Sequence, residues 1–333
     1  MKLLINSLWT LTVFTASTSR AFAPSSTHSK LYKAATTATT SATVVPAPKT
    51  QRRMIGSIFD MLGGGSAELV KPEDALPGRS QCVLPGKDTL RHHVLGNKLD
   101  EVPEGYEKAV YANGCFWGSE KGAWRFPFGI HSTAVGYCGG FTPNPTYEEA
   151  CSGRTGHTEG VKVVFNPNEV SFVDVMRWFW EAHDPTSGMG QGNDRGSQYR
   201  SGFYYFNEDQ KKLLQASKEA YEKALAETTG KDRKITTEIA AASDYDKYGG
   251  VWYYAEEYHQ QYLAKPGARP YCSAQPQGVS LPDYDKWCPF PEGSAEREKY
   301  RPKLPESFWN EHAPKRGCSV VNSPNEPVAA SSL

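Results

Sequence analysis

The strongest restriction on the fold of this chain comes from a cysteine that lies between a β-strand pattern and a helical pattern. The strand pattern ends at Ala112, the pentapeptide Gly114-Cys115-Phe116-Trp117-Gly118 follows, and the next residues favour a helix. Unpaired backbone N–H groups at the start of a helix stabilise a thiolate, the reactive form of cysteine. Phe116 and Trp117 place two aromatic rings beside the sulfur, so we expect a reactive Cys115 in a small apolar pocket. A buried core cysteine with aromatic neighbours is the alternative.

Helical and strand patterns alternate from Tyr106 onward, which predicts an α+β fold: a compact two-layer domain with a mixed sheet and packed helices. An extended N-terminal leader and a C-terminal tail flank this domain. One helix is expected to begin at Ser171, where Asp174 completes a capping box. The other expected helices follow the pentapeptide, begin at Asn207 and cover 255–263, and the expected strands cover 130–137, 161–165, 201–206 and 235–239.

Composition excludes several classes of protein. The formal net charge is zero, but residues 1–53 contain seven basic and no acidic residues, which leaves 30 basic against 37 acidic residues in the remainder. Such an acidic body argues against binding to nucleic acid, which requires a basic face. Seven cysteines in a long chain, without a CxxC pair, argue against both a disulfide-stapled scaffold and structural zinc.

The N-terminal 53 residues have the composition of a targeting leader. The apolar stretch 3–14 is too short to span a bilayer but suits a signal-peptide core, so no stable membrane insertion is expected. Residues 25–43 are rich in Ser, Thr and Ala, like a transit peptide. The order resembles the bipartite leaders of algae with complex plastids, which predicts a plastid location. Secretion, or a tail without targeting function, is the alternative. Residues 54–105 are interpreted as a linker, with a short helix at 55–62, and a surface-wrapping segment.

Three polar stretches interrupt the alternation of helices and strands, at residues 136–147, 151–159 and 183–200. Each is a loop by its Gly, Pro and Asn content, and each lies next to the end of an expected strand. Loops held at strand ends by a rigid scaffold are common places for functional sites. These stretches are therefore the candidates for residues that complete a site around Cys115.

Four segments of the chain closely resemble peptide methionine sulfoxide reductase, type A. They are the pentapeptide and residues 155–159, 191–200 and 258–262, and they occur in the family's order. The resemblance covers residues 106–281. It implies a catalytic domain at 106–265 and a C-terminal tail at 266–333 that supplies a resolving cysteine.

The resemblance also implies a role for each matching side chain. Methionine sulfoxide carries an oxygen and a methyl group on one chiral sulfur, so its reduction requires a nucleophile, an acid and an apolar pocket. A carboxyl group beside aromatic walls has a raised pKa and can act as the acid. The implied residues are the nucleophile Cys115, the acid Glu159, the oxygen-binding Tyr147 and Tyr199, the methyl pocket Phe116 and Trp117, and the pocket-lining Asp194.

A sulfenic acid on Cys115 would condense with a second thiol, and Cys272 matches the family's first resolving cysteine. Many family members use a further cysteine eight residues later, but Ser280 stands there in this chain. Either Cys272 passes its disulfide directly to the reductant, or Cys288 or Cys318 takes over the relay. Of these two, Cys288 is favoured because it is closer in sequence and lies in the same aromatic, Pro-rich part of the tail. The resemblance further implies thioredoxin as the reductant and the S-sulfoxide of free and protein-bound methionine as the substrate. No motif indicates a metal or nucleotide cofactor.

Two other functions remain open from the residues themselves. His157, His183 or His259 could activate Cys115 in a cysteine-dependent hydrolase or acyltransferase. A non-enzymatic thiol redox sensor would need no acid in the pocket. We interpret the remaining cysteines and the His92-His93 pair as structural or surface residues, among them Cys82, Cys138 and Cys151.

Overall fold

The computed structural model describes residues 68–333. The targeting leader at 1–53 and the helix expected at 55–62 lie outside the described residues. Among residues 68–333, no helix is long and apolar enough to cross a membrane.

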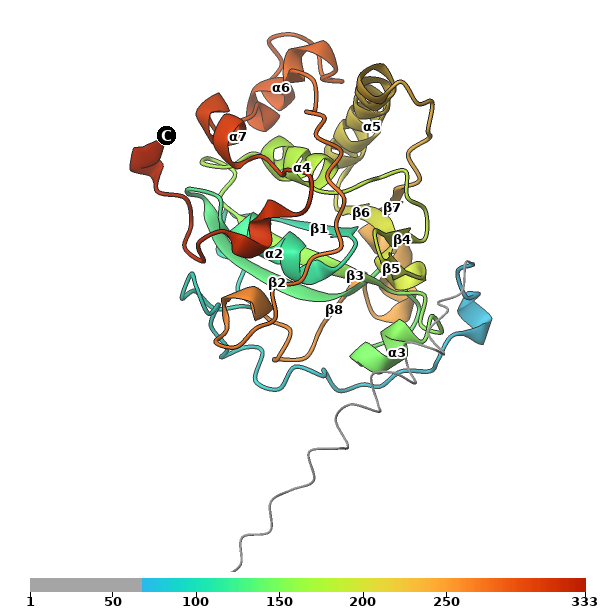
Figure 1. Cartoon of the computed structure of the whole chain (residues 1–333). Coiled ribbons are helices and arrows are strands. Elements are labelled where there is room, and N and C mark those ends of the chain that lie inside the picture. Colours follow the sequence, from blue (N-terminus) through green and yellow to red (C-terminus); the bar gives the residue numbers. More distant parts are fainter. Residues whose placement is uncertain (1–67) are drawn as a thin grey trace, which may run out of the picture. The chain divides into compact units, whose positions relative to one another are not determined.

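A six-stranded sheet forms the centre of the described part (Figure 1), with strand order β7-β6-β1-β3-β2-β8. The pairing is antiparallel except between β6 and β7, which are parallel, so the sheet is mixed as predicted. The strands are β1 (Glu107–Asn113), β2 (Ile130–Cys138), β3 (Thr158–Phe165), β6 (Ser201–Tyr205), β7 (Glu238–Ala241) and β8 (Trp252–Tyr254). A separate pair joins β4 (Gly190–Gln191) to β5 (Asp194–Arg195).

The longer helices begin where their capping residues predict. The Ser171 hydroxyl accepts a hydrogen bond from the N–H of Asp174, and the Asp174 carboxylate accepts one from the N–H of Ser171. The α-helices are α2 (Phe116–Trp124), α3 (Tyr147–Cys151), α4 (Phe172–Glu181), α5 (Glu208–Thr229), α6 (Ala295–Tyr300) and α7 (Glu306–His312). Short 3-10 helices cover Pro72–Asp74, Ser197–Tyr199, Ala242–Tyr248, Tyr262–Ala264, Tyr284–Lys286, Ser319–Asn322 and Ala330–Ser332.

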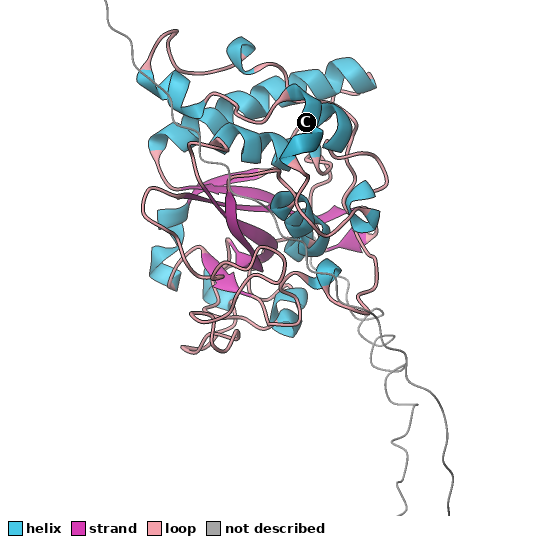
Figure 2. Ribbon diagram, turned by 90° about the vertical axis from the view of Figure 1, so that its left-hand side faces the viewer, coloured by secondary structure: helices cyan, strands magenta, loops and turns pink. Residues whose placement is uncertain are grey.

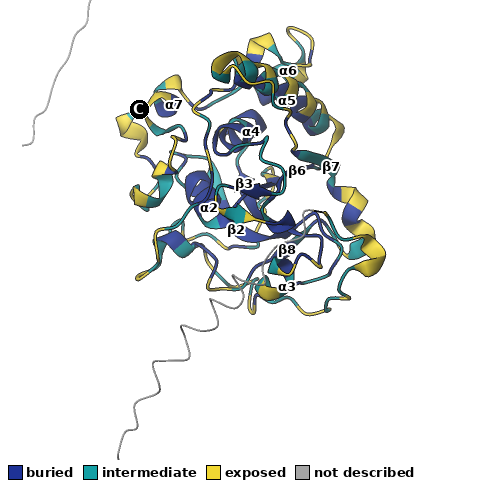
Figure 3. Ribbon diagram, turned by 45° about the vertical axis from the view of Figure 1, so that its right-hand side comes forward, coloured by how far each residue is buried: buried dark blue, intermediate teal, exposed yellow. Residues whose placement is uncertain are grey.

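The main hydrophobic core lies between the sheet and the helices on one of its faces (Figures 1 and 2). Tyr111 of β1 illustrates this packing, because its ring contacts Phe179 of α4 and Phe203 of β6 with centroid distances of 5.6 and 5.7 Å. The opposite face of the sheet is covered in part by the N-terminal segment, whose Leu84 and Leu99 are buried against it. The strands of the sheet are buried along most of their length, except for the edge strand β7, whose residues are only partly buried (Figure 3).

The C-terminal tail packs against the same core. Tyr300, Phe308 and Trp309 are buried and belong to the main hydrophobic cluster. The ring of Phe308 contacts Phe126, which follows α2, at a centroid distance of 5.5 Å. The tail is therefore not a free extension of the domain, because its aromatic residues are anchored beside α2.

Two of the expected elements differ in the structure. The strand expected at 235–239 is shifted to β7. The helix expected at 255–263 is wrong, because only the 3-10 turn Tyr262–Ala264 forms there. The reason is that Gln260 uses its side-chain amide to bond both backbone groups of Val135 in β2. Gln261 adopts a positive φ of 46°, which no helix accommodates.

Candidate active site

Cys115 is the N-cap residue of α2 and lies directly after β1 and Gly114. The predicted junction between a strand and a helix is therefore confirmed. Gly114 has φ of +94°, and a Cβ atom there would lie 2.7 Å from the side chain of Gln191. Glycine is required on both grounds, because the backbone is left-handed and strand β4, which carries Gln191, packs directly on it.

Burial dominates the chemistry of the Cys115 thiol. The residue is only 5% exposed, and burial followed by the charge of Glu159 raises its pKa well above the ordinary value. The N–H groups of Trp117 and Gly118 oppose this by stabilising the thiolate, as expected at a helix start. Burial outweighs these N–H groups, so the net shift of the Cys115 pKa in the folded protein favours the thiol.

Glu159 is buried beside Cys115 and holds a proton near neutral pH. It is the second residue of β3, 3% exposed, and its Oε2 accepts a hydrogen bond of 3.1 Å from the backbone N–H of Phe116. Burial raises its pKa to about 8, although the Phe116 N–H stabilises the carboxylate. The structure thus brings a carboxylic acid to the same helix turn as the thiol.

Tyr147 and Tyr199 approach the same carboxyl group from two different loops. Tyr147 is the first residue of α3, and Tyr199 ends the 3-10 helix Ser197–Tyr199. Burial and then the charge of Glu159 raise the pKa of both phenols, so both keep their protons and can donate hydrogen bonds. Tyr147 also interacts with Cys151 on the next turn of α3, and burial raises the pKa of that thiol to about 12.

Phe116 and Trp117 form an aromatic group with residues from the segment after β8. The Trp117 indole stacks on Tyr262 with ring centroids 3.9 Å apart. Its Nε1–H donates a hydrogen bond of 3.1 Å to Nδ1 of His259, whose ring also lies 5.1 Å from that of Phe116. His259 therefore fixes the orientation of the indole.

The three histidines considered for a cysteine–histidine pair are engaged elsewhere. His157 is hydrogen-bonded through Nε2 to the carbonyl of Thr142. His183 bonds the carbonyl of Phe179 and the hydroxyl of Ser201, and His259 accepts from Trp117. Burial lowers the pKa of each below its ordinary value. Neutral histidines bonded in this way do not support a hydrolase built on Cys115.

Sequence reasoning missed residues that position the site loops. Glu256 accepts a hydrogen bond from the Tyr137 hydroxyl and another from the backbone N–H of Tyr147. Arg200 donates to the Gly139 carbonyl and to Glu238, and so connects the loop after β2 to the sheet edge. Arg200 lies within a recognised motif and could have been found there. Glu256 was hidden by the wrongly expected helix.

Cys272 forms a disulfide with Cys318, with a Cα–Cα distance of 6.1 Å. The bridge lies against the first turn of α2, because a Cβ atom on Gly118 would lie 2.7 Å from Cys272 Sγ and 3.4 Å from Cys318 Sγ. Cys115 itself is a free thiol. The structure therefore places both tail sulfurs three residues along the helix from Cys115.

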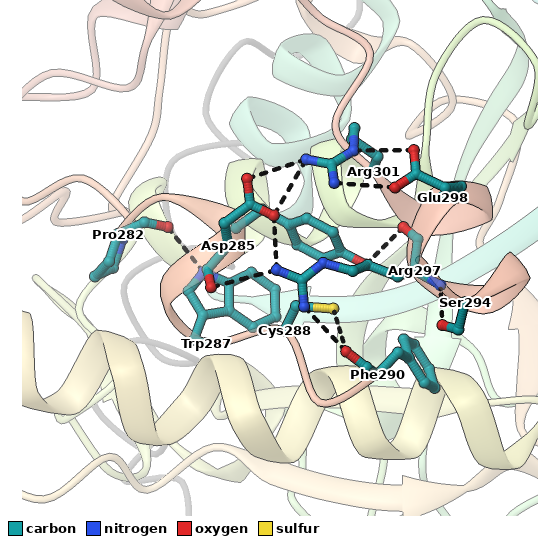
Figure 4. Close-up of polar contacts among 10 residues, drawn as sticks. Pro282, Asp285, Trp287, Cys288, Phe290, Ser294, Arg297, Glu298 and Arg301 are labelled. Carbon is teal, nitrogen blue, oxygen red and sulfur yellow. Dashed lines mark hydrogen bonds and ion pairs between the residues drawn. The ribbon is translucent and has the colours of Figure 1, made fainter. Parts of the chain in front are cut away.

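Cys288, the residue we favoured as partner of Cys272, lies in a different cluster (Figure 4). Its sulfur approaches the Phe290 carbonyl at 3.9 Å. Beside it, Asp285 forms ion pairs with Arg297 and Arg301. The preference for Cys288 is corrected by the observed pairing, since closeness in sequence did not reflect the path of the tail.

Among residues 68–333, no group of three or more His, Cys, Asp or Glu side chains could hold a metal ion. Around Cys115 the described residues provide a thiol, a neutral carboxyl group and two phenols. Such a set can deliver a nucleophile and protons to a polar substrate atom.

Fold and sequence together show that the chain belongs to the peptide methionine sulfoxide reductase family, whose family model matches residues 107–283. The similar relatives are type A enzymes, and the chain is accordingly an oxidoreductase of that type. Peptide methionine sulfoxide reductase MsrA 1 of Synechocystis sp. is 48% identical over 225 residues, which is 67% of this chain and 95% of the relative. The mitochondrial enzyme of Bos taurus is 45% identical over 69% of this chain and 94% of its own. Methionine sulfoxide reductase A of Corynebacterium diphtheriae is a solved structure with a TM-score of 0.54 and 40% identity, and the match covers 68% of this chain and all of that one (100%).

Proposed function

We propose that this chain reduces the S-sulfoxide of methionine, both free and in proteins, and that thioredoxin returns it to the reduced state. The substrate follows from the names of the relatives and from the type A resemblance. The observation that supports the chemistry best is the neutral Glu159 carboxyl group beside the Cys115 thiol. A sulfoxide oxygen is a poor leaving group until it is protonated, and Glu159 supplies that proton.

In the first step the Cys115 sulfur attacks the sulfoxide sulfur, and the oxygen ends on Cys115. The sulfoxide gains two electrons and becomes a thioether, while the thiol loses two electrons and becomes a sulfenic acid. Glu159 donates its proton to the oxygen, and its carboxylate then takes the proton that the thiol releases. Tyr147 and Tyr199 donate hydrogen bonds to the same oxygen, because both phenols stay protonated near Glu159.

The methyl group of the substrate packs against Phe116 and Trp117 in this proposal. Trp117 is suited to this because stacking on Tyr262 and the hydrogen bond to His259 hold its ring in place. A fixed aromatic wall selects a small methyl substituent over a larger one. Asp194 lies near enough to raise the pKa of Glu159 further, so it helps to keep the acid protonated.

Recycling proceeds through the two tail cysteines. The Cys272 thiol attacks the sulfenic acid, so that a disulfide to Cys115 forms and water leaves. The Cys318 thiolate then attacks Cys272, which frees the Cys115 thiol and produces the Cys272–Cys318 disulfide found in the structure. A thioredoxin dithiol reduces this disulfide and is itself oxidised to a disulfide.

Replacement of Glu159 by glutamine tests the proposed acid. Single-turnover reduction of N-acetylmethionine S-sulfoxide should slow by about 10²- to 10⁴-fold, the usual contribution of general acid catalysis. Alkylation of Cys115 by iodoacetamide should continue. Glu120→Gln is the matched control, because Glu120 of α2 is likewise a buried carboxyl group but is bonded to Gln261 and Thr133. Its single-turnover rate should stay near that of the parent protein.

The same variants separate the proposal from its alternatives. A redox sensor without a pocket acid would be indifferent to Glu159→Gln. A hydrolase would instead lose activity with alanine at His157, His183 or His259. Unchanged sulfoxide turnover in Glu159→Gln, together with its loss in all three histidine variants, would contradict the reductase mechanism.

We also propose that residues 1–53 direct the protein to a plastid. The support is the order of an apolar signal core followed by a basic, Ser/Thr-rich and acid-free segment. Fusion of residues 1–53 to a fluorescent protein tests this, in an alga with complex plastids. Fluorescence in the cytosol would overturn the targeting role, and fluorescence in the medium would favour secretion.

A further inference from the structure

Tyr271, the residue before Cys272, reaches into the site from the tail. Its hydroxyl donates a hydrogen bond of 2.6 Å to Oδ1 of Asp194. Its ring lies edge-on to the Trp117 indole, with centroids 6.4 Å apart and an interplanar angle of 84°. The Cys115 sulfur is near enough to affect the ionisation of this phenol. Tyr271 thus contacts two residues that line the proposed sulfoxide pocket.

The position of Tyr271 is set by the disulfide that follows it. Cys272 is bonded to Cys318 and packed on Gly118. The next residue, Ser273, packs closely on Gly192: a Cβ atom on Gly192 would lie only 2.5 Å from the Ser273 carbonyl oxygen. Residues 270–278 form no helix or strand, so no ladder of backbone hydrogen bonds fixes them. The disulfide is the one covalent restraint on Tyr271 among these contacts.

The contacts of Tyr271 compete with a bound substrate. Asp194 has its Oδ1 occupied by the Tyr271 hydroxyl, and the ring of Tyr271 lies edge-on against the partly buried Trp117 indole. A sulfoxide that enters between these residues must displace a hydrogen bond to a carboxylate. Such bonds contribute more than neutral ones, enough to change a dissociation constant by about tenfold or more.

We propose that Tyr271 closes the sulfoxide pocket while Cys272 is bonded to Cys318, and opens it when that disulfide is reduced. The inference rests on the proposed function of the site. Reduction adds two electrons and two protons and gives two thiols, and the reductant dithiol becomes a disulfide. Tyr271 is then held by one hydrogen bond and a ring contact, and it is partly exposed, so the segment can withdraw. The spent enzyme therefore excludes new substrate until it has been reduced.

Binding without turnover tests this directly. The full chain with Cys115→Ser cannot reduce a sulfoxide, and its Cys272–Cys318 disulfide is verified by peptide mass spectrometry. Isothermal titration with N-acetylmethionine S-sulfoxide compares this oxidised form with the form reduced by dithiothreitol. We expect the reduced form to bind at least about tenfold more tightly. Equal binding, or tighter binding by the oxidised form, would overturn the proposal.

Substitution of Tyr271 then assigns the effect to this side chain. In the oxidised form, Tyr271→Ala should bring the dissociation constant to within about twofold of that of the reduced protein. Tyr271→Phe should remove only the share of the difference between the two forms that is due to the hydroxyl. Tyr258→Phe is the control, since Tyr258 is an exposed tyrosine that contacts His259 and should leave the difference intact. Weak binding in both oxidised Tyr271 variants would overturn the gate. Absence of binding in both the oxidised and the reduced form would overturn the proposed function, and the gate with it.

Discussion

The two ends of helix α2 differ in what they contribute to the protein. At the N-terminal end lie the N-cap Cys115 and, bonded to the Phe116 N–H, Glu159 of β3, two buried ionisable groups whose pKa values are raised by burial. The last turn is anchored by the tail: Lys121 donates to the Ser323 carbonyl and to Asn325, and Trp124 donates to the Asn325 carbonyl. Burial of ionisable groups costs stability, whereas these contacts and the aromatic packing beside them provide it. The reactive end is thus held in position by residues beyond the part of the chain that the family model matches.

Removal of Phe308, an aromatic residue of the tail that packs beside α2, should cause the largest loss of stability. Phe308→Ala deletes a ring that is 1% exposed and packs on Phe126 after α2. We expect a loss of about 3–5 kcal/mol in the free energy of unfolding, measured by urea denaturation. Asn310→Ala, an exposed position of the same helix α7, should change it little. A small effect of Phe308→Ala would mean that the tail is not part of the core.

At the reactive end, by contrast, removal of an ionisable group should raise the stability relative to the parent protein as the pH increases. The pKa of Glu159 is about 8 in the folded protein against an ordinary value of 4.5. Between these pH values the folded state keeps a proton that the unfolded chain has lost, so this contribution to stability falls as the pH rises. Glu159→Gln does not titrate. The free energy of unfolding of Glu159→Gln, relative to that of the parent protein, should therefore increase by on the order of 3 kcal/mol from pH 5 to pH 8.

Urea denaturation of both proteins at several pH values measures this difference. Glu120→Gln gives a second reference, because burial raises the pKa of Glu120 to about 7 and its gain should level off at a lower pH. A difference between Glu159→Gln and the parent protein that stays constant from pH 5 to pH 8 would contradict a buried neutral Glu159.

The features that could be predicted from the sequence are those set by interactions between residues close together in the chain. The capping box at Ser171 and the junction at Cys115 are both formed, because each needs only residues a few positions apart. A raised pKa for Glu159 was also predictable, since aromatic neighbours exclude water. The direction of the Cys115 pKa shift was not predictable from the pentapeptide, because burial by the surrounding fold outweighs the nearby N–H groups.

Features that depend on the path of the tail could not be predicted from the sequence. Cys272 and Cys318 are separated by 46 residues, so nothing local to either distinguishes Cys318 from Cys288 as the partner. Tyr271 reaches Asp194 for the same reason, across 77 residues. The segment 255–263 looked helical, but Gln260 uses its amide to bond β2, which is a tertiary contact.

Removal of Cys318 tests whether the tail is needed for recycling as well as for the fold. Cys318→Ser should lower thioredoxin-dependent turnover by about 100-fold, because the buried Cys115–Cys272 disulfide would then lack its intramolecular exit. Single-turnover reduction by the pre-reduced protein should stay unchanged. Cys288→Ser is the matched control and should recycle normally, since Cys288 lies in the Asp285 cluster. The reverse outcome for the two variants would show that the observed pairing is not the recycling route.

The smallest expected effect concerns the polar anchor at the end of α2. Lys121 is 2% exposed, and its ammonium group donates to the Ser323 carbonyl at 2.8 Å and to Oδ1 of Asn325 at 3.0 Å. Asn325→Ala removes one acceptor from a buried cation, which should cost about 1–2 kcal/mol in the free energy of unfolding. Asn322→Ala, an exposed asparagine nearby, should cost nothing measurable. If Asn325→Ala also slowed thioredoxin-dependent turnover without affecting the single turnover, the anchor would be needed to hold Cys318 beside Cys272, and not only for stability.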